Sequence, residues 1–244
     1  MLPQLLSAST LDRIKEVALT SSIASYSWKD RGRAPKGYLI GFATAFAVCI
    51  SRGNDPITGE MGRAEVGDEE EDALAWYADE FFALGMHNNV SGVDTLRHLW
   101  ALMLGLGMRE SSGKYCEGRD TSASNTTSET AEAGLFQMSW NAQYCSASMG
   151  ELFDEYNGSP WTHGYESRFQ EGVDCNYSSW ECYGSGEGFW YQYHAKHLPV
   201  FACETTAIAL RSLRQHWGPI NRHEVELKTA SDEMLKSIQA IVHG

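Results

Sequence analysis

A single glutamate stands at the end of a predicted apolar helical face. The residues of that face are spaced by three or four positions, as on one side of an α-helix: Val93, Leu96, Trp100, Met103, Gly107 and Glu110. A carboxylate that continues an apolar face is costly to bury unless it is protonated or partnered. A carboxylic acid kept protonated can donate its proton to a departing glycosidic oxygen. The sequence therefore predicts Glu110 as a general acid, with a frayed, solvated helix end as the alternative.

The polar segment after this helix contains three acidic residues that could act together with Glu110. They are Asp120, Glu129 and Glu132. A base about 6.5–9.5 Å from the acid would give an inverting glycosidase, and a nucleophile about 5–5.5 Å away would give a retaining one. Each of the three is a candidate for the second carboxylate, and a solvated loop acid is the alternative for each.

Two short motifs in this region resemble the signature of goose-type lysozymes and soluble lytic transglycosylases. The first is Arg-Glu-Ser-Ser-Gly at residues 109–113, and the second is Ala-Gly-Leu-Phe-Gln at residues 133–137. The family signature is a helix-ending Glu-Ser followed by a Gly-Leu-Met-Gln-like turn. The resemblance covers residues 96–141, under a fifth of the chain. It implies a mostly α-helical, lysozyme-like fold in which Glu110 is the catalytic acid.

The resemblance also orders the candidates for the second carboxylate. Glu132 lies two residues before Gly134, where transglycosylases typically carry a small residue, so a charge there points to a hydrolase. Asp120 is similar in placement to an acidic loop of goose-type lysozymes, and Glu129 ranks third. A transglycosylase would need none of them, because a hydroxyl of its own substrate attacks intramolecularly. We therefore expect a hydrolase that uses Glu132 or Asp120, with transglycosylation by Glu110 alone as the alternative.

The residues expected to bind the sugar come from the second motif and from later aromatic residues. In the family the Gly-Leu-x-Gln segment lines the cleft. A family marker, a Tyr-Asn-x-Gly-like segment on a later helix, is only echoed at residues 156–158, which we expect in a loop. Trp190 with Tyr191, or Tyr193, could supply the aromatic wall instead. The sugar-binding residues that we expect are Gly134, Gln137, Ser139, Trp190 and Tyr191.

The rest of the chain is predicted to be mainly helical, with long loops around the candidate site. Helices are expected at residues 10–25, 38–50, 68–84, 93–109, 204–216 and 222–242, and loops at residues 29–37, 53–67, 115–131 and 144–188. The apolar run at residues 38–50 is shorter than the ~20 residues that a bilayer requires, so it is assigned to the core. We expect one catalytic domain, in which residues 1–92 form a helical extension and residues 93–244 the catalytic core.

The charge balance limits the partners. The net charge is −13, from 19 Lys and Arg against 32 Asp and Glu, without a basic stripe. Nucleic acid and anionic membrane surfaces are therefore not expected as partners, and neither is membrane insertion. A polysaccharide is expected: peptidoglycan is the family default, and the acidic balance leaves room for a chitin-like or cationic glucosamine polymer. The alternative is that the negative charge only keeps the protein soluble. We expect a monomer with no cofactor and no metal, since His194 and His197 lack a third ligand.

Six cysteines form an even set, for which we expect two or three disulfides and a secreted or periplasmic location. Cys175 and Cys182 flank a short polar loop that a disulfide could close, while Cys116 and Cys145 bracket the candidate site. Buried free thiols are the alternative. The first residues show no charged region before a long apolar stretch, so export would require a removed signal peptide or another route.

Two other functions are compatible with the same residues. A carbohydrate-binding relative could keep the fold and lose turnover, in which case replacing Glu110 would leave its function intact. A toxin delivered to competing cells would account for the absence of a recognisable signal peptide.

Overall fold

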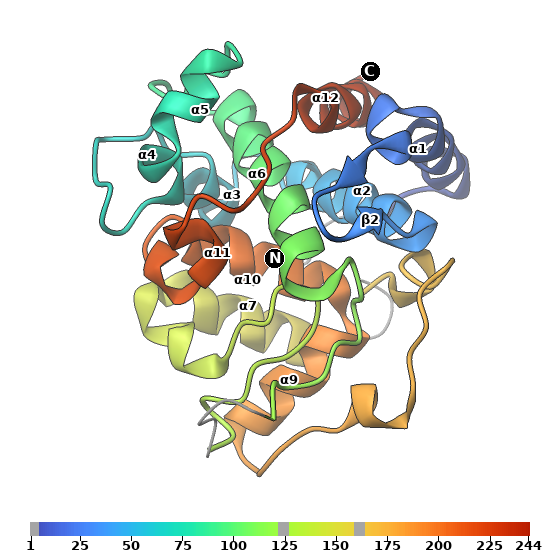
Figure 1. Cartoon of the computed structure of the whole chain (residues 1–244), viewed down its shortest axis with the longest axis vertical. Helices are drawn as coiled ribbons and strands as arrows, with labels where there is room; N and C mark the ends of the chain where they lie inside the picture. Colours follow the sequence, from blue (N-terminus) through green and yellow to red (C-terminus); the bar gives the residue numbers. More distant parts are fainter. Residues whose placement is uncertain (1–4, 122–126, 159–163) are drawn as a thin grey trace.

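The computed structural model describes residues 5–121, 127–158 and 164–244, and these residues are mostly helical (Figure 1). The strands in these ranges are β1 (Ser27–Trp28) and β2 (Gly32–Arg33), which pair as a short antiparallel hairpin. The prediction of a mostly α-helical chain is therefore confirmed.

Helix α6 (Val93–Ser111) crosses the middle of the molecule and ends near the centre of the face seen in Figure 1. The other α-helices of the described ranges are α1 (Ala8–Thr20), α2 (Lys36–Ser51), α3 (Pro56–Met61), α4 (Ala73–Trp76), α5 (Ala78–Ala83), α7 (Ala147–Gly158), α9 (Glu187–His197), α10 (Pro199–Ala209), α11 (Gly218–Asn221) and α12 (Thr229–His243). Short 3-10 turns occur at Ser22–Ser25, Trp140–Cys145, Glu166–Arg168, Tyr177–Trp180 and Arg214–His216.

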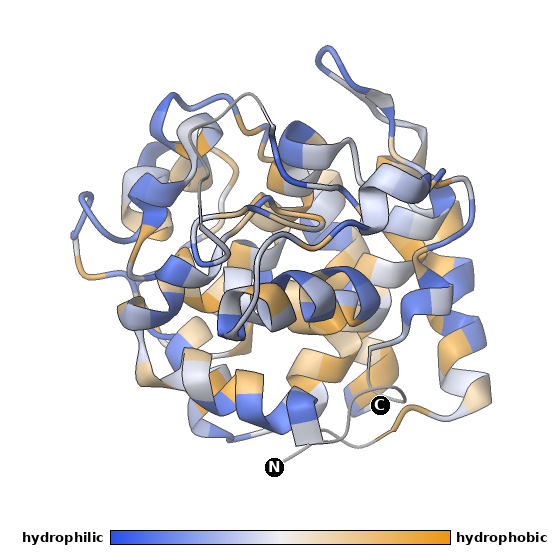
Figure 2. Cartoon of the chain, turned by 90° about the horizontal axis from the view of Figure 1, so that it is seen from below, coloured by the Kyte–Doolittle hydropathy of each residue, from blue (hydrophilic) through white to orange (hydrophobic). Residues whose placement is uncertain are grey.

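The predicted core helix is confirmed as α2, in which every residue from 37 to 50 is buried. Helix α2 packs against α1 on one side and against α10 and α12 on others, and α6 packs against α12. The inner helices are largely apolar in Figure 2, whereas the outer turns are hydrophilic. No helix in the described ranges combines the length and apolarity needed to cross a membrane.

Some helix and loop predictions were wrong. The first helix ends at Thr20 rather than at residue 25, and the expected helix at residues 68–84 is divided into α4 and α5. The expected loop at residues 53–67 contains α3, whose start is fixed by Asp55: its carboxylate accepts a hydrogen bond from the amide of Ile57. A proline at the first helical position favours the same start.

The expected loop at residues 144–188 contains helix α7. The buried side chains of α7 are Met149, Leu152, Phe153 and Tyr156, a spacing of three and four that is typical of one helical face. The Tyr-Asn-Gly sequence at residues 156–158 therefore lies in a helix and not in a loop. The abundance of Gly, Ser and Asn obscured this pattern.

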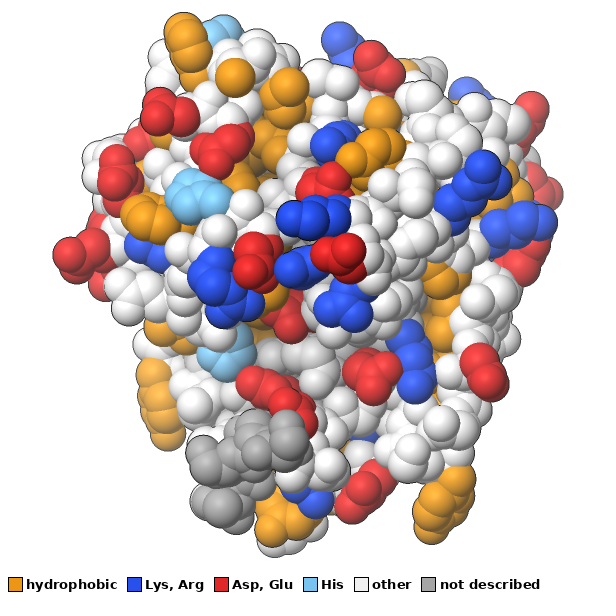
Figure 3. Space-filling view, viewed as in Figure 1, with side chains coloured by type: hydrophobic (Ala, Val, Ile, Leu, Met, Phe, Trp, Pro, Cys, Tyr) orange, Lys and Arg blue, Asp and Glu red, His pale blue; other side chains and the backbone are white. Residues whose placement is uncertain are grey.

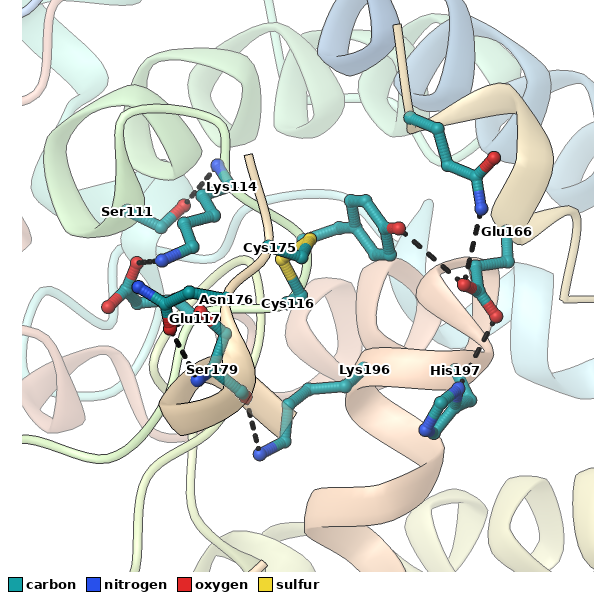
Figure 4. Close-up of a disulfide and its surroundings, with 12 residues drawn as sticks. Ser111, Lys114, Cys116, Glu117, Glu166, Cys175, Asn176, Ser179, Lys196 and His197 are labelled. Atoms are coloured by element: carbon teal, nitrogen blue, oxygen red, sulfur yellow. Dashed lines mark hydrogen bonds and ion pairs between the residues drawn. A yellow bond between two sulfur atoms is a disulfide. The ribbon is translucent and has the colours of Figure 1, made fainter. Parts of the chain in front are cut away.

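One disulfide joins Cys116 to Cys175, so the suggested bond between Cys175 and Cys182 was wrong (Figure 4). The remaining cysteines have free thiols: Cys49, Cys145, Cys182 and Cys203. The disulfide fixes residue 116, which follows α6, to the segment that precedes α9. The expectation of two or three disulfides was therefore wrong, because the six cysteines form one. The alternative of buried free thiols applies to Cys49 and Cys203.

Two buried arginines connect helices that are distant in sequence. Arg52, at the end of α2, pairs with Glu204 of α10 at 2.7 Å, and both side chains are fully buried. Glu204 also accepts a hydrogen bond from the hydroxyl of Tyr156 in α7. Arg211 pairs with Asp72 at 2.7 Å, and Asp72 caps α4 by accepting from the amide of Leu74. In each pair the buried arginine and the buried carboxylate compensate one another, and an unpaired charge in the core would be costly.

Candidate active site

The end of helix α6 is fixed by a left-handed turn that packs on Tyr38. Ser112 has φ 56° and donates its amide proton to the carbonyl oxygen of Met108, and Gly113 (φ 78°) donates to Gly107. A side chain at position 113 would lie 2.7 Å from the Tyr38 ring, so only glycine fits both this conformation and this contact. The turn stops α6 one residue after Glu110 and presents that side chain at the helix end.

The two motifs identified in the sequence lie against each other. Ser111 donates from its hydroxyl to the carbonyl oxygen of Leu135 at 2.8 Å. The amide of Gly134 donates to the carbonyl oxygen of Glu117 at 2.8 Å, and Ala133 pairs with Met138 in an isolated bridge. The turn at residues 133–138 is therefore held beside the end of α6 by hydrogen bonds.

A cleft of about 560 Å³ lies at this junction, within the ~300–1,000 Å³ range of small-ligand sites. It brings together four of the predicted site residues: Glu110, Asp120, Glu132 and Gln137. Gln137 is held with φ 48°, and its side-chain amide donates to the carbonyl oxygen of Gly134. Figure 3 shows acidic and basic side chains intermixed across the middle of the face on which α6 ends.

The surroundings of Glu110 favour its protonated form near neutral pH. Burial first, and then the nearby Glu132 carboxylate, raise the pKa of Glu110 from 4.5 to about 7. Arg31, Arg222 and Arg109 act in the opposite direction. Within the described ranges the Glu110 carboxylate makes no hydrogen bond or ion pair, so its proton is available to a ligand in the cleft.

Four predicted residues do not line the cleft. Gly134 shapes the turn instead: it has φ 71°, and a side chain there would lie 2.8 Å from the carbonyl oxygen of Ala195. Ser139 is buried and donates to Asn141 at 2.7 Å.

The two aromatic residues on α9 lie outside the cleft as well. Tyr191 is only 1% exposed and stacks on Trp140, so its ring has no free face for a sugar. Trp190 is 50% exposed, but it contacts Phe189 and Tyr193 and is not part of the cleft lining. The expected aromatic wall from Trp190 and Tyr191 is therefore absent from this cleft. Glu129 also lies outside it, where it accepts from the hydroxyl of Ser128.

Three charged residues of the cleft were not predicted: Arg31, Glu117 and Arg119. Glu117 and Arg119 lie within the polar loop in which only the acidic candidates were considered. Arg31 is contributed by the β1–β2 hairpin, where one of its guanidinium nitrogens donates to the carbonyl oxygen of Arg109 at 2.6 Å. No local pattern could indicate a contact across 78 positions. The segment expected to be a helical extension, residues 1–92, thus contributes Arg31 to the cleft.

In this cleft the carboxyl group of Glu110 could donate a proton beside the carboxylate of Glu132. Groups of three or more His, Cys, Asp and Glu side chains that could hold a metal ion do not occur within residues 5–121, 127–158 and 164–244. The described lining of the cleft supplies carboxyl, guanidinium, amide and hydroxyl groups. Comparisons with known proteins gave no match: no family model, no curated protein and no solved structure matches this chain.

Proposed function

We propose that this protein is a lysozyme-like glycosidase that cleaves a β-linked polysaccharide containing N-acetylhexosamine. Glu110 acts as the general acid that protonates the leaving oxygen. Glu132 activates the water that completes hydrolysis, and Asp120 is the second candidate for that role. A secreted or periplasmic location is part of the proposal, because disulfides such as Cys116–Cys175 persist in oxidising compartments.

The raised pKa of Glu110 carries this proposal. A general acid works best when its pKa lies near the working pH, because it is then both protonated and able to release its proton. The pKa of about 7 meets that condition. Its causes, burial and a second carboxylate, are the ones that glycosidases use to keep one of two acids protonated.

Hydrolysis is favoured over transglycosylation by the position of Glu132. This residue lines the same cleft as Glu110 and is close enough to raise its pKa. A transglycosylase has no use for a second carboxylate near its acid. The presence of Glu132 in the same cleft therefore supports a mechanism in which a second carboxylate activates a water molecule.

The test is product analysis by mass spectrometry after incubation with peptidoglycan, chitin oligomers and chitosan. We expect the wild type to release reducing-end products, and Glu110→Gln to lose at least about a thousandfold in kcat, since it removes the proton donor. Glu132→Gln is expected to lower kcat strongly while KM changes little. Glu129→Gln is the matched control, because this acid of the same loop lies outside the cleft.

Three results would contradict the proposal in different ways. Products lighter by one water would establish a transglycosylase and remove the role of Glu132. Equal activity of Glu110→Gln and wild type would show that Glu110 is not the acid. Saccharide binding without cleavage by the wild type would establish a carbohydrate-binding protein.

A further inference from the structure

Helix α5 and the loops on either side of it carry exposed apolar side chains. Eight large hydrophobic side chains are exposed in the described residues, and four of them lie within residues 66–90. They are Val66 and Phe82, each 73% exposed, Val90 at 69% and Leu84 at 37%. Single exposed hydrophobic residues are ordinary, whereas a cluster of them marks an interaction surface. These four residues are called the α5 surface below.

The loops of the α5 surface lie side by side. The amide of Glu65 donates to the carbonyl oxygen of Asn88 at 2.8 Å. This hydrogen bond joins the loop before α4 to the loop after α5, which carry the two exposed valines. The ring of Phe82 contacts the ring of His87, with 5.8 Å between the ring centres. The exposed apolar residues therefore belong to one surface and are not scattered over the molecule.

The α5 surface contains a pocket of about 510 Å³. Its apolar lining includes Leu74, Phe81, Phe82 and Met86. A hollow of this kind beside exposed apolar side chains can receive an apolar anchor residue from a partner. An amphipathic helix commonly docks in this way, with its apolar face against a hydrophobic groove.

The α5 surface is surrounded by negative charge. Residues 65–90 contain eight Asp and Glu and no Lys or Arg. Asp72 pairs with Arg211, and Glu80 pairs with His223. The other six form no ion pair with any residue that the structure describes: Glu65, Asp68, Glu69, Glu70, Glu71 and Asp79. These carboxylates are available to a cationic partner.

The acidic and the apolar side chains share one region of the molecule. Figure 3 shows both kinds gathered at the upper left, where Figure 1 places α4 and α5. Glu65 and Asp79 line the pocket itself, together with one basic side chain, His87. Arg214 approaches the acidic run, but it donates to the carbonyl oxygen of Glu69 and to Asn221. The pocket thus combines an apolar lining with an acidic rim.

We propose that the α5 surface is a docking site for a basic, amphipathic segment of another protein. One apolar side chain of that segment enters the pocket, and Lys or Arg side chains beside it meet the acidic rim. Charge complementarity selects this occupant. A second copy of the chain would bring the same carboxylates against each other in a two-fold contact. An anionic membrane would be repelled in the same way.

The docking site is remote from the candidate active site. Asn88 contacts His98 of α6 at 2.8 Å, and Glu110 lies twelve residues further along that helix. With a rise of 1.5 Å per residue, these two positions on α6 are about 18 Å apart. A partner on the α5 surface therefore leaves the cleft open, and this inference does not rest on the proposed glycosidase activity.

The test uses a fluorescent 14-residue peptide of Leu and Lys, with the leucines spaced to form one face of a helix. One control peptide has the same composition in scrambled order, and another has Glu in place of Lys. We expect the amphipathic basic peptide to bind at least about tenfold more tightly than either control, measured by fluorescence anisotropy. Binding should weaken as the salt concentration rises, and NMR shifts of the protein should be concentrated in residues 64–91.

Variants with matched controls locate the binding. Phe82→Ala is expected to weaken peptide binding about fivefold to tenfold, because it removes an apolar contact at the pocket. Asp79→Asn should weaken it about twofold to fivefold. Tyr144→Ala removes an exposed aromatic side chain outside the pocket, and Asp154→Asn removes an exposed charge on α7, so both should bind as the wild type does. Thermal unfolding checks that all four variants fold.

Three results would overturn the proposal. The first is equal binding of the amphipathic and scrambled peptides, and the second is unchanged binding in both Phe82→Ala and Asp79→Asn. The third is a different occupant: a dimer in sedimentation that Phe82→Ala abolishes would establish a second copy, and Phe82-dependent binding to phosphatidylglycerol vesicles would establish a lipid surface. A chain that cleaves no glycan would leave this inference intact.

Discussion

At the scale of single residues, the state of the Glu110 proton should determine the pH dependence of activity. Its pKa is raised to about 7, and the acid is active only while protonated. Activity, measured as kcat/KM, should therefore fall as the pH rises through about 7. Glu132 raises this pKa and Arg31 lowers it. Titration of the Glu110 carboxyl group by NMR should accordingly give a lower pKa in Glu132→Gln and a higher one in Arg31→Gln.

Opposite shifts of the Glu110 pKa in these two variants would indicate electrostatic coupling. A general loosening of the site would instead move the Glu110 pKa toward 4.5 in both variants. Glu129→Gln serves as the control and should leave the titration unchanged. A Glu110 carboxyl group that titrates near 4.5 in the wild type would contradict the electrostatic environment described for the cleft.

The site residues differ in how far the sequence could predict them. Glu110 could be placed from helical spacing, because its position on the face of α6 depends on local geometry. Glu132 and Gln137 followed from resemblance to a short motif. Arg31 could not be predicted, because its place depends on the packing of a hairpin against the last turn of α6, and that contact has no local signature. Tyr191 was misassigned because an aromatic residue beside glycines can be either a sugar platform or a core side chain.

At the scale of elements, the Cys116–Cys175 disulfide should hold the loop that carries the cleft residues 117–121. The cysteines are 59 positions apart, for which loop-closure entropy gives a stabilisation of about 4 kcal/mol. We expect Cys175→Ala to lower the free energy of unfolding by up to that amount, measured by denaturant titration. It should also raise KM, because the loop that lines the cleft is less constrained.

Cys182→Ala is the matched control, since Cys182 is a half-buried free thiol in the neighbouring segment. A reducing agent should destabilise the wild type and Cys182→Ala to the same extent and leave Cys175→Ala unaffected. Equal sensitivity of all three proteins to the reducing agent would argue against the Cys116–Cys175 bond as the source of stability.

The sequence predicted helices correctly where the apolar spacing was uninterrupted. The predictions failed where polar residues dominated the composition. The core helix α2 and the long α6 fall in the first group. Helix α7 shows the same spacing in its buried face, but its exposed face is rich in Gly, Ser, Asn and acidic residues. Elements of this kind form because the chain packs them against a core: Tyr156 of α7, for example, contacts Phe201 of α10. Such tertiary contacts override weak local preference.

At the scale of the whole molecule, helices from the first part of the chain pack against helices from the last part. Helices α1 and α2 come from the first part of the chain and α10 and α12 from the last part, yet α2 packs against all three others. The sequence contains no linker between the first and last parts of the chain. It also could not predict that these helices pack together, because contacts between distant parts of a chain leave no periodic pattern in the sequence.

The buried pair of Arg52 and Glu204 should contribute strongly to this association. Arg52 lies at the end of α2 and Glu204 lies in α10, and neither side chain is exposed. We expect Arg52→Ala to lower the free energy of unfolding by about 3–5 kcal/mol, because it leaves the buried Glu204 carboxylate without its cation. Lys15→Ala is the control: the pair of Lys15 with Glu171 is 45% exposed on both sides, and surface pairs contribute about 1 kcal/mol or less. Denaturant titration of both variants measures the difference. Equal losses would mean that apolar packing, and not this ion pair, holds α2 against α10.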